Sequence, residues 1–122
     1  MIISVFDYLN YKRYLKDKLD FFGKKERGWK VRAAAHIGCQ ASYLSQILNG
    51  KPDLTLDQAH KINQLFAHDK IESRFFILLV EYYRASSAEL KEFINEQMQE
   101  LMQTRFDLKK RLKNVSRDRN SI

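Results

Sequence analysis

The sequence predicts an all-α fold in which a compact set of helices precedes one long C-terminal helix. Apolar residues recur at spacings of three and four along most of the chain, and no run alternates β-branched with polar residues. Pro52 is the only proline among 122 residues, so few positions must interrupt a helix. With 44% hydrophobic and 12% aromatic residues, the chain can bury a core. We expect a compact domain over residues 1–85 and a long helix with a basic tail over residues 86–122.

The first predicted helix covers residues 7–22. Its apolar stripe is formed at steps of three and four by Tyr8, Tyr11, Leu15, Leu19 and Phe22. Gly23 and the charged run 24–28 predict its end. Most of six nearby basic side chains are expected to be solvated, and some could meet a phosphate if this helix flanks a duplex: Lys12, Arg13, Lys16, Lys18, Lys24 and Lys25.

Residues 34–51 are the most informative stretch of the chain. They predict a short helix, a tight turn at Gly38, a second short helix and a further turn at Asn49-Gly50. The alanines at positions 33–35 let the two helices approach closely, and glycine permits a left-handed turn. Two helices joined so closely are typical of a helix-turn-helix, which places its second helix in the major groove of DNA.

The second of these helices has one apolar and one polar face. Leu44 and Ile47 are expected to anchor it to the core. The outward positions are predicted to contact base edges: Gln40, Ala41, Ser42, Tyr43, Ser45 and Gln46. Glutamine can bind adenine through two hydrogen bonds, serine can bind several bases, and alanine can contact the thymine methyl group. No arginine lies on this face, which favours modest specificity or an A·T-rich site. The alternative is a helical bundle whose polar helix only faces solvent.

Three later helix starts are marked by a capping residue followed three positions on by glutamine or glutamate. The pairs are Thr55 with Gln58, Asp69 with Glu72, and Ser86 with Glu89. They predict helices over residues 56–67, over residues 70–84, and from residue 87 to about residue 115. The helix at 70–84 is apolar on two sides, so its second side needs cover from the last helix or from another protomer.

The last helix carries an apolar seam at heptad spacing that predicts self-association as a homodimer. The seam consists of Ile94, Met98, Leu101, Leu108 and Leu112, with a break at Arg105 and an end at Val115. Two recognition helices of a dimer can span half-sites about 34–36 Å apart. The alternative is a helix that folds back on its own chain. The basic tail either contacts phosphates or only aids solubility; it contains Arg105, Lys109, Lys110, Arg111, Lys113, Arg117 and Arg119.

Composition narrows the possible partners and compartment. The net charge of +7 favours a polyanionic partner. Cys39 is the only cysteine, which excludes an intramolecular disulfide and suits a reducing cytoplasm. The longest apolar run, residues 75–80, is shorter than the roughly 20 residues of a membrane span, and the N-terminus lacks a signal-peptide pattern. We expect a cytoplasmic, nucleoid-associated protein without a membrane partner.

No pattern predicts catalysis, a cofactor or a metal site, so we do not expect an enzyme. The sequence lacks a phosphate-binding glycine-rich loop, a metal-spaced His/Glu motif and a Gly-x-Ser-x-Gly elbow. His36 and Cys39 have zinc-ligand spacing, but a second pair is missing. We expect Cys39 to fill a small apolar slot after the turn, and His60 and His68 to be exposed.

Within residues 29–66, a spaced pattern resembles the Cro and phage-repressor type of helix-turn-helix protein. It consists of Ala34, Gly38, Leu44, Ile47, Asn49, Gly50 and Lys51, then Leu54, Thr55 and Leu56, and finally Ala59, Ile62 and Leu65. The resemblance implies a compact five-helix domain, often dimeric, in which bases are read by Gln40, Ala41, Ser42, Tyr43 and Gln46. It implies phosphate contacts from Lys30, Asn49 and Lys51. Lys30 replaces the family's usual glutamine, and Gln40 replaces the usual serine or threonine cap.

A second resemblance spans more of the chain. Its residues are Phe6, Tyr8, Asn10, Tyr11, Lys12, Tyr14 and Leu15, followed after the turn motif by Glu72, Phe75, Phe76, Leu79 and Val80. This pattern is similar to a bacterial family of two-part predicted regulators, with Asn10 and Lys12 in place of the usual Asp and Arg. The family's second domain is not expected here, because the sequence stops at residue 122.

Together these observations predict sequence-selective binding of double-stranded DNA by a homodimeric transcriptional regulator. The alternative is a protein-interaction module, either an antitoxin or a short dimerising competitor of a longer homologous regulator. RNA is a less favoured target, because the aromatic residues are predicted to be buried rather than displayed for base stacking.

Overall fold

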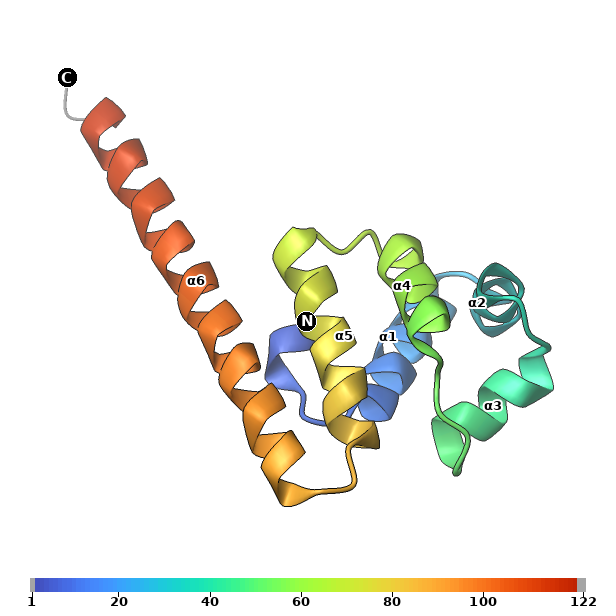
Figure 1. Ribbon diagram of the computed structural model, residues 1–122. Helices are drawn as coiled ribbons and strands as arrows, with labels where there is room; N and C mark the ends of the chain where they lie inside the picture. The colour runs from blue at the N-terminus through green and yellow to red at the C-terminus, as the bar shows by residue number, and fades with distance from the viewer. Residues whose placement is uncertain (1, 121–122) are drawn as a thin grey trace.

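The computed structural model describes the backbone of residues 2–120 and the side chains of residues 2–114. The fold is all-α, and the described residues contain no strand. A 3-10 turn, η1 (Val5–Asp7), precedes six helices: α1 (Tyr11–Lys25), α2 (Trp29–Ile37), α3 (Ala41–Asn49), α4 (Leu56–Leu65), α5 (Lys70–Arg84) and α6 (Ala88–Asn120). In Figure 1, α1 to α5 form a compact body, and α6 runs along the side of α5 and past the end of that body. No helix in the described range is long and apolar enough to cross a membrane.

Reciprocal side-chain caps fix the starts of α4 and α5. The hydroxyl of Thr55 accepts from the backbone N–H of Gln58, whose side chain accepts in return from the N–H of Thr55. Asp69 and Glu72 form the same capping box at α5. Both starts agree with the sequence prediction, and α5 also ends where predicted, at Arg84.

The start and the end of α1 differ from the prediction of residues 7–22. Asn10 caps the helix, because its Oδ1 accepts from the backbone N–H groups of Lys12 at 2.9 Å and Arg13 at 3.3 Å. The helix therefore begins at residue 11. Gly23 does not end it, and the last turn continues to Lys25.

The start of α6 also differs from the prediction by one residue. Ser87, not Ser86, accepts the backbone N–H of Leu90 at 3.1 Å. The helix accordingly begins at Ala88, and it continues beyond its predicted end to Asn120.

The helices share one apolar core with α5 at its centre. The largest fully buried side chains include Tyr11, Tyr14, Phe75, Phe76, Leu44 and Ile62. α5 contacts α1, α4 and η1, and it packs most extensively against α6. The second apolar side of α5 is therefore covered by the last helix of the same chain.

The predicted dimer seam divides into two parts. Three of its residues are buried within the chain, on the α5 side of α6: Ile94, Met98 and Leu101. In this conformation these three residues pack within the chain and do not face a second copy, and self-association through the rest of the seam stays a prediction. Leu108 and Leu112 are exposed, on the part of α6 that extends past the body (Figure 1). The tail and seam residues Val115, Arg117 and Arg119 lie outside the described side chains.

Candidate nucleic-acid interface

The turn between α2 and α3 is built on a left-handed glycine. Gly38 has φ 82°, as the sequence predicted, and its N–H donates to the carbonyl oxygen of Ala35. The N–H of Cys39 donates to the carbonyl oxygen of Ala34 at 2.9 Å, which completes the end of α2. The Cys39 side chain packs against the core at this turn. The turn thereby fixes α3 at a defined angle to α2.

α3 has one face in the core and one face in solvent. Leu44, Ile47 and Leu48 are buried. The exposed side chains are Gln40, Ser42, Tyr43, Gln46 and Asn49. Of the six residues predicted to contact bases, Ala41 and Ser45 are half-buried at the border of this face, and Ala41 packs against the core. The remaining four lie on an open polar surface, which we call the outer face of α3.

The residues predicted to contact phosphates lie beside the outer face of α3. The ammonium of Lys30, from the first turn of α2, donates to the hydroxyl of Ser45 at 3.1 Å. At the other end of α3, the side-chain amide of Asn49 donates to the carbonyl oxygen of Ser45 at 3.0 Å. Lys51 follows in the loop and is exposed. The fold thus brings cations from two separate segments near one polar helix, with Lys30 beside its middle and Lys51 just after its end.

Lys12 departs from the prediction of a solvated side chain. It is only 5% exposed. Its ammonium lies 2.6 Å from the carbonyl oxygen of Gly50, 2.8 Å from that of Pro52 and 3.5 Å from a carboxylate oxygen of Asp53. The hydroxyl of Tyr11 donates to the same carboxylate at 2.7 Å. α1 therefore holds the loop that follows α3, and with it the backbone that carries the predicted phosphate contact at position 51.

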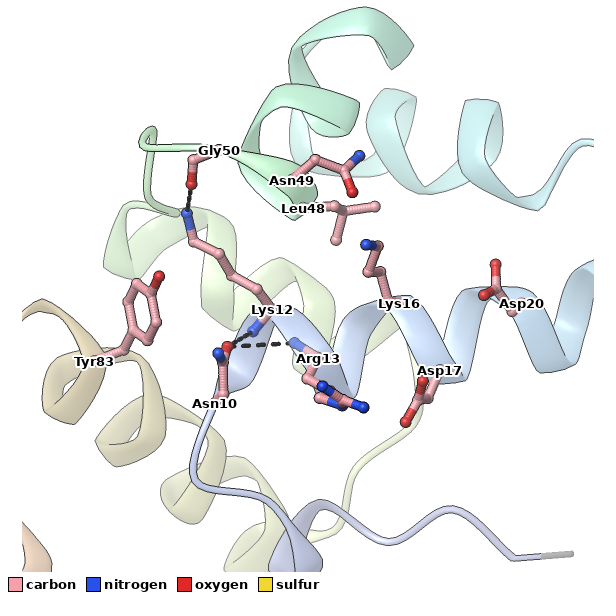
Figure 2. Close-up of a pocket in the computed structure, with 10 residues that line it drawn as sticks. All are labelled: Asn10, Lys12, Arg13, Lys16, Asp17, Asp20, Leu48, Asn49, Gly50 and Tyr83. Atoms are coloured by element: carbon pink, nitrogen blue, oxygen red, sulfur yellow. Dashed lines mark hydrogen bonds between the residues drawn. The ribbon is translucent and has the colours of Figure 1, made fainter.

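A cleft of 490 Å³ separates α1 from the end of α3 (Figure 2). Two exposed cations of α1, Arg13 and Lys16, line it opposite Asn49. In Figure 2, the side chain of Lys16 points across the cleft toward α3. Two carboxylates of α1, Asp17 and Asp20, also line the cleft, and Asp17 accepts a hydrogen bond from the hydroxyl of Tyr8 at 2.6 Å. Arg13 and Lys16 are among the cations that the sequence predicted could meet a phosphate if this helix flanks a duplex, and the fold places them near the end of α3.

The first turns of α2 and α3 carry no side-chain cap. Gly28 precedes α2 and Gln40 precedes α3, and neither position provides a side-chain hydrogen bond to the helix. Backbone N–H groups at such a helix start can donate to an anion, and the helix dipole favours negative charge there. Because the Gln40 side chain does not cap α3, backbone donors remain available at the start of this helix.

His68 is half-buried, whereas the sequence predicted an exposed side chain. The hydroxyl of Tyr14 lies 2.7 Å from His68 Nε2, and Asn63 Oδ1 lies 2.7 Å from His68 Nδ1. Because the amide nitrogen of Asn63 donates to the carbonyl oxygen of Ser73, its oxygen is the acceptor, and the neutral ring donates from Nδ1. Burial, with a smaller contribution from Lys18, lowers the pKa of His68 to about 4. The ring thus links α1, α4 and α5 as a neutral structural group.

No family model, curated protein or solved structure matches the chain.

Proposed function

We propose that the chain binds double-stranded DNA sequence-selectively and regulates transcription, with α3 as the recognition helix of a Cro-type helix-turn-helix domain. The observation that carries this proposal is the outer face of α3. Its polar side chains are exposed, while Leu44, Ile47 and Leu48 anchor the opposite face in the core. A helix held in this way is rigid, and its exposed amide and hydroxyl groups suit base edges in the major groove.

The distribution of cations supports a duplex as the target. Lys30 lies beside the middle of α3, while Lys51, Arg13 and Lys16 lie near its end. When side chains contact phosphates on both sides of a groove, they fix the position of the recognition helix. Such contacts also supply affinity that is independent of sequence. The uncapped starts of α2 and α3 add backbone donors for the same purpose.

The arrangement of α6 leaves the outer face of α3 accessible. α6 packs on α5, and in Figure 1 it lies on the opposite side of α5 from α3. A duplex can therefore approach α3 without displacing the described part of the last helix. We further propose that the protein acts in the cytoplasm, at the nucleoid, as a homodimer on a two-fold symmetric operator.

Selection from a pool of random duplexes with the purified protein tests this proposal. We expect an enriched motif, and we expect fluorescence anisotropy to give tighter binding to that motif than to a shuffled duplex. Typical specific sites are bound at least about a thousandfold more tightly than other DNA at physiological salt. Equal affinity for the selected and shuffled duplexes at that salt concentration would contradict sequence-selective binding.

A second candidate function is protein interaction, as an antitoxin or as a competitor of a longer homologous regulator. The exposed apolar side chains on the extended part of α6 favour it: Phe106, Leu108 and Leu112. Recovery of a longer homologous protein in a pull-down, with no duplex retained at physiological salt, would favour this candidate over DNA binding.

A further inference from the structure

The exposed charges of α6 are mostly acidic in its first half and mostly basic in its second half, where Asp107 is the exception among the described side chains. The first half carries the exposed glutamates Glu89, Glu92, Glu96 and Glu100. The second half carries the exposed cations Lys109, Lys110, Arg111 and Lys113. Among the described side chains, none of these four glutamates takes part in an ion pair. The helix therefore presents two separate surfaces of opposite charge.

Each half of α6 also exposes apolar side chains. In the first half, Leu90 and Phe93 are exposed even though the neighbouring face of the helix is buried on α5, and Phe93 is 60% exposed. In the second half, Leu112 is 70% exposed, and Leu108 lies one helical turn before it. Apolar side chains of this size on a lone helix are typical of a surface that another chain covers.

Within the second half of α6, the Arg105 guanidinium lies over the Phe6 ring, 4.4 Å from its centroid. Beyond that contact α6 extends past the body as a single helix (Figure 1), and its described apolar side chains Phe106, Leu108 and Leu112 are exposed. It also lies on the side of the molecule remote from α3 (Figure 1). A duplex bound at the outer face of α3 is therefore badly placed to neutralise its lysines, whereas a second protein chain is well placed to do so.

We propose that a second copy of this chain covers α6, and that the two α6 helices pair antiparallel. In a parallel pair, the glutamates of one copy would face the glutamates of the other, and the lysines would face lysines. An antiparallel pair sets the acidic half of each copy against the basic half of its partner. The same orientation brings Leu90 and Phe93 of one copy near Leu108 and Leu112 of the other. The paired α6 helices would form the dimer contact of the proposed DNA-binding protein. The pairing does not require DNA binding, and only its biological use rests on that proposed function.

Sedimentation of the full chain without DNA tests the pairing. At about 50 µM and about 50 mM salt we expect twice the monomer mass of 14.5 kDa. The dissociation constant should rise roughly tenfold at about 500 mM salt, because salt screens exposed charges. A 14.5 kDa species at low salt, or association that strengthens with salt, would overturn the proposal.

Charge reversal provides matched variants. The triple variant Lys109→Glu, Lys110→Glu, Lys113→Glu and the triple variant Glu89→Lys, Glu92→Lys, Glu96→Lys should each sediment as monomers, because each gives the two halves of α6 a net charge of the same sign. All six positions are exposed, so circular dichroism should report unchanged helix content. An equimolar mixture of the two variants should form heterodimers. If each variant alone self-associates as strongly as the wild type, the charge-paired arrangement is overturned.

A distance measurement tests the orientation. A spin label at Lys113→Cys in a Cys39→Ala background should give a distance of about 35 Å between copies, if residues 89–113 overlap fully at 1.5 Å per residue. Labels within about 15 Å of each other would indicate parallel helices and would overturn the proposal. Because these measurements contain no DNA, their failure leaves the DNA-binding proposal to its own test.

Discussion

The buried ammonium of Lys12 donates to the carbonyl oxygen of Gly50 at 2.6 Å, across 38 positions of the sequence. The same ammonium donates to the carbonyl oxygen of Pro52. These bonds join the first turn of α1 to the loop that follows α3. One lysine thus ties the start of the fold to the segment that carries Lys51.

Replacing Lys12 with methionine should destabilise the fold by about 2–3 kcal/mol, because two loop carbonyl groups lose a charged donor. The change keeps the length of the side chain and removes its hydrogen bonds. Urea denaturation measures the loss. The matched control is Lys16→Met on the exposed face of the same helix, where we expect less than about 0.5 kcal/mol. Similar losses in both variants would show that the buried contacts of Lys12 contribute little.

Gln46 and Lys51 should affect DNA binding in different ways. Gln46→Ala should cost about 1–3 kcal/mol of discrimination at one base position, whereas Lys51→Ala should weaken binding to all sequences alike. Anisotropy titrations on the selected duplex and its single-base variants measure both effects. Gln64→Ala on the exposed side of α4 is the control. Identical specificity profiles for Gln46→Ala and the wild type would remove Gln46 from the base-contacting set.

Lys16 should contribute one phosphate contact from the cleft between α1 and α3. Lys16→Ala should lower the slope of log affinity against log salt by about 1, equally for selected and shuffled duplexes. Lys70→Ala, at the start of α5, is the matched control, since that helix start lies away from α3 (Figure 1). If Lys16→Ala has the same salt slope as the wild type, Lys16 does not contact a phosphate and the duplex does not reach this cleft.

Two glycine substitutions should change stability in opposite directions. Gly38→Ala should cost about 1–2 kcal/mol, because φ is 82° there and the Cβ atom disfavours a left-handed backbone. Gly23 lies inside α1, and a Cβ atom built on it meets nothing within 4 Å. Gly23→Ala should therefore raise the free energy of unfolding by about 0.5–1 kcal/mol. Thermal unfolding of both variants measures the contrast, which disappears if backbone conformation at these positions is unimportant.

The neutral ring of His68 should make stability depend on pH below 7. Burial lowers its pKa to about 4 from 6.5, so the unfolded chain binds a proton in this range and the folded chain does not. The contribution of the neutral ring is fully present above pH 6.5 and is lost as the pH falls toward 4. By about pH 5 the loss should be about 1–2 kcal/mol, allowing for partial solvent access to the ring.

Urea denaturation at about pH 7 and about pH 5 measures this effect. His68→Phe should reduce the difference between the two pH values, whatever its effect on stability at pH 7. His60→Gln, at an exposed position of α4, should retain the difference of the wild type. An unchanged pH dependence in His68→Phe would mean that another group causes it.

Local chemistry explains which helix boundaries could be predicted from the sequence. α4 and α5 begin at capping boxes, whose two partners lie three residues apart and are visible in the sequence. α1 begins at Tyr11 after the cap residue Asn10, which has Arg13 three positions later instead of glutamine or glutamate. Without that second partner, the apolar periodicity through Tyr8 made the helix look longer than it is.

The outer face of α3 was predictable because burial within one short helix follows the helical period. The roles of Lys12 and His68 were not predictable in this way. Their partners belong to other elements, such as the loop at residues 50–53 and the hydroxyl of Tyr14. No local spacing encodes such contacts, so a basic residue on a helix and a histidine in a loop were both expected to be solvated.

The leucine pattern of α6 could not distinguish internal packing from self-association. Both use the same spacing of apolar residues. In the structure Met98 and Leu101 lie in the core while Leu108 is exposed, so internal packing accounts for only the first part of the pattern.

The position of α6 across α5 from α3 also has an evolutionary consequence. Substitutions more than about 10 Å apart with no shared partners usually have additive effects on free energy. Changes at Gln46 in α3 and at Leu112 in α6 meet that condition if each surface works as proposed, because α3 and α6 lie on opposite sides of α5 (Figure 1). Operator specificity could then change during evolution without altering the dimerisation partner, and the partner could change without altering operator specificity.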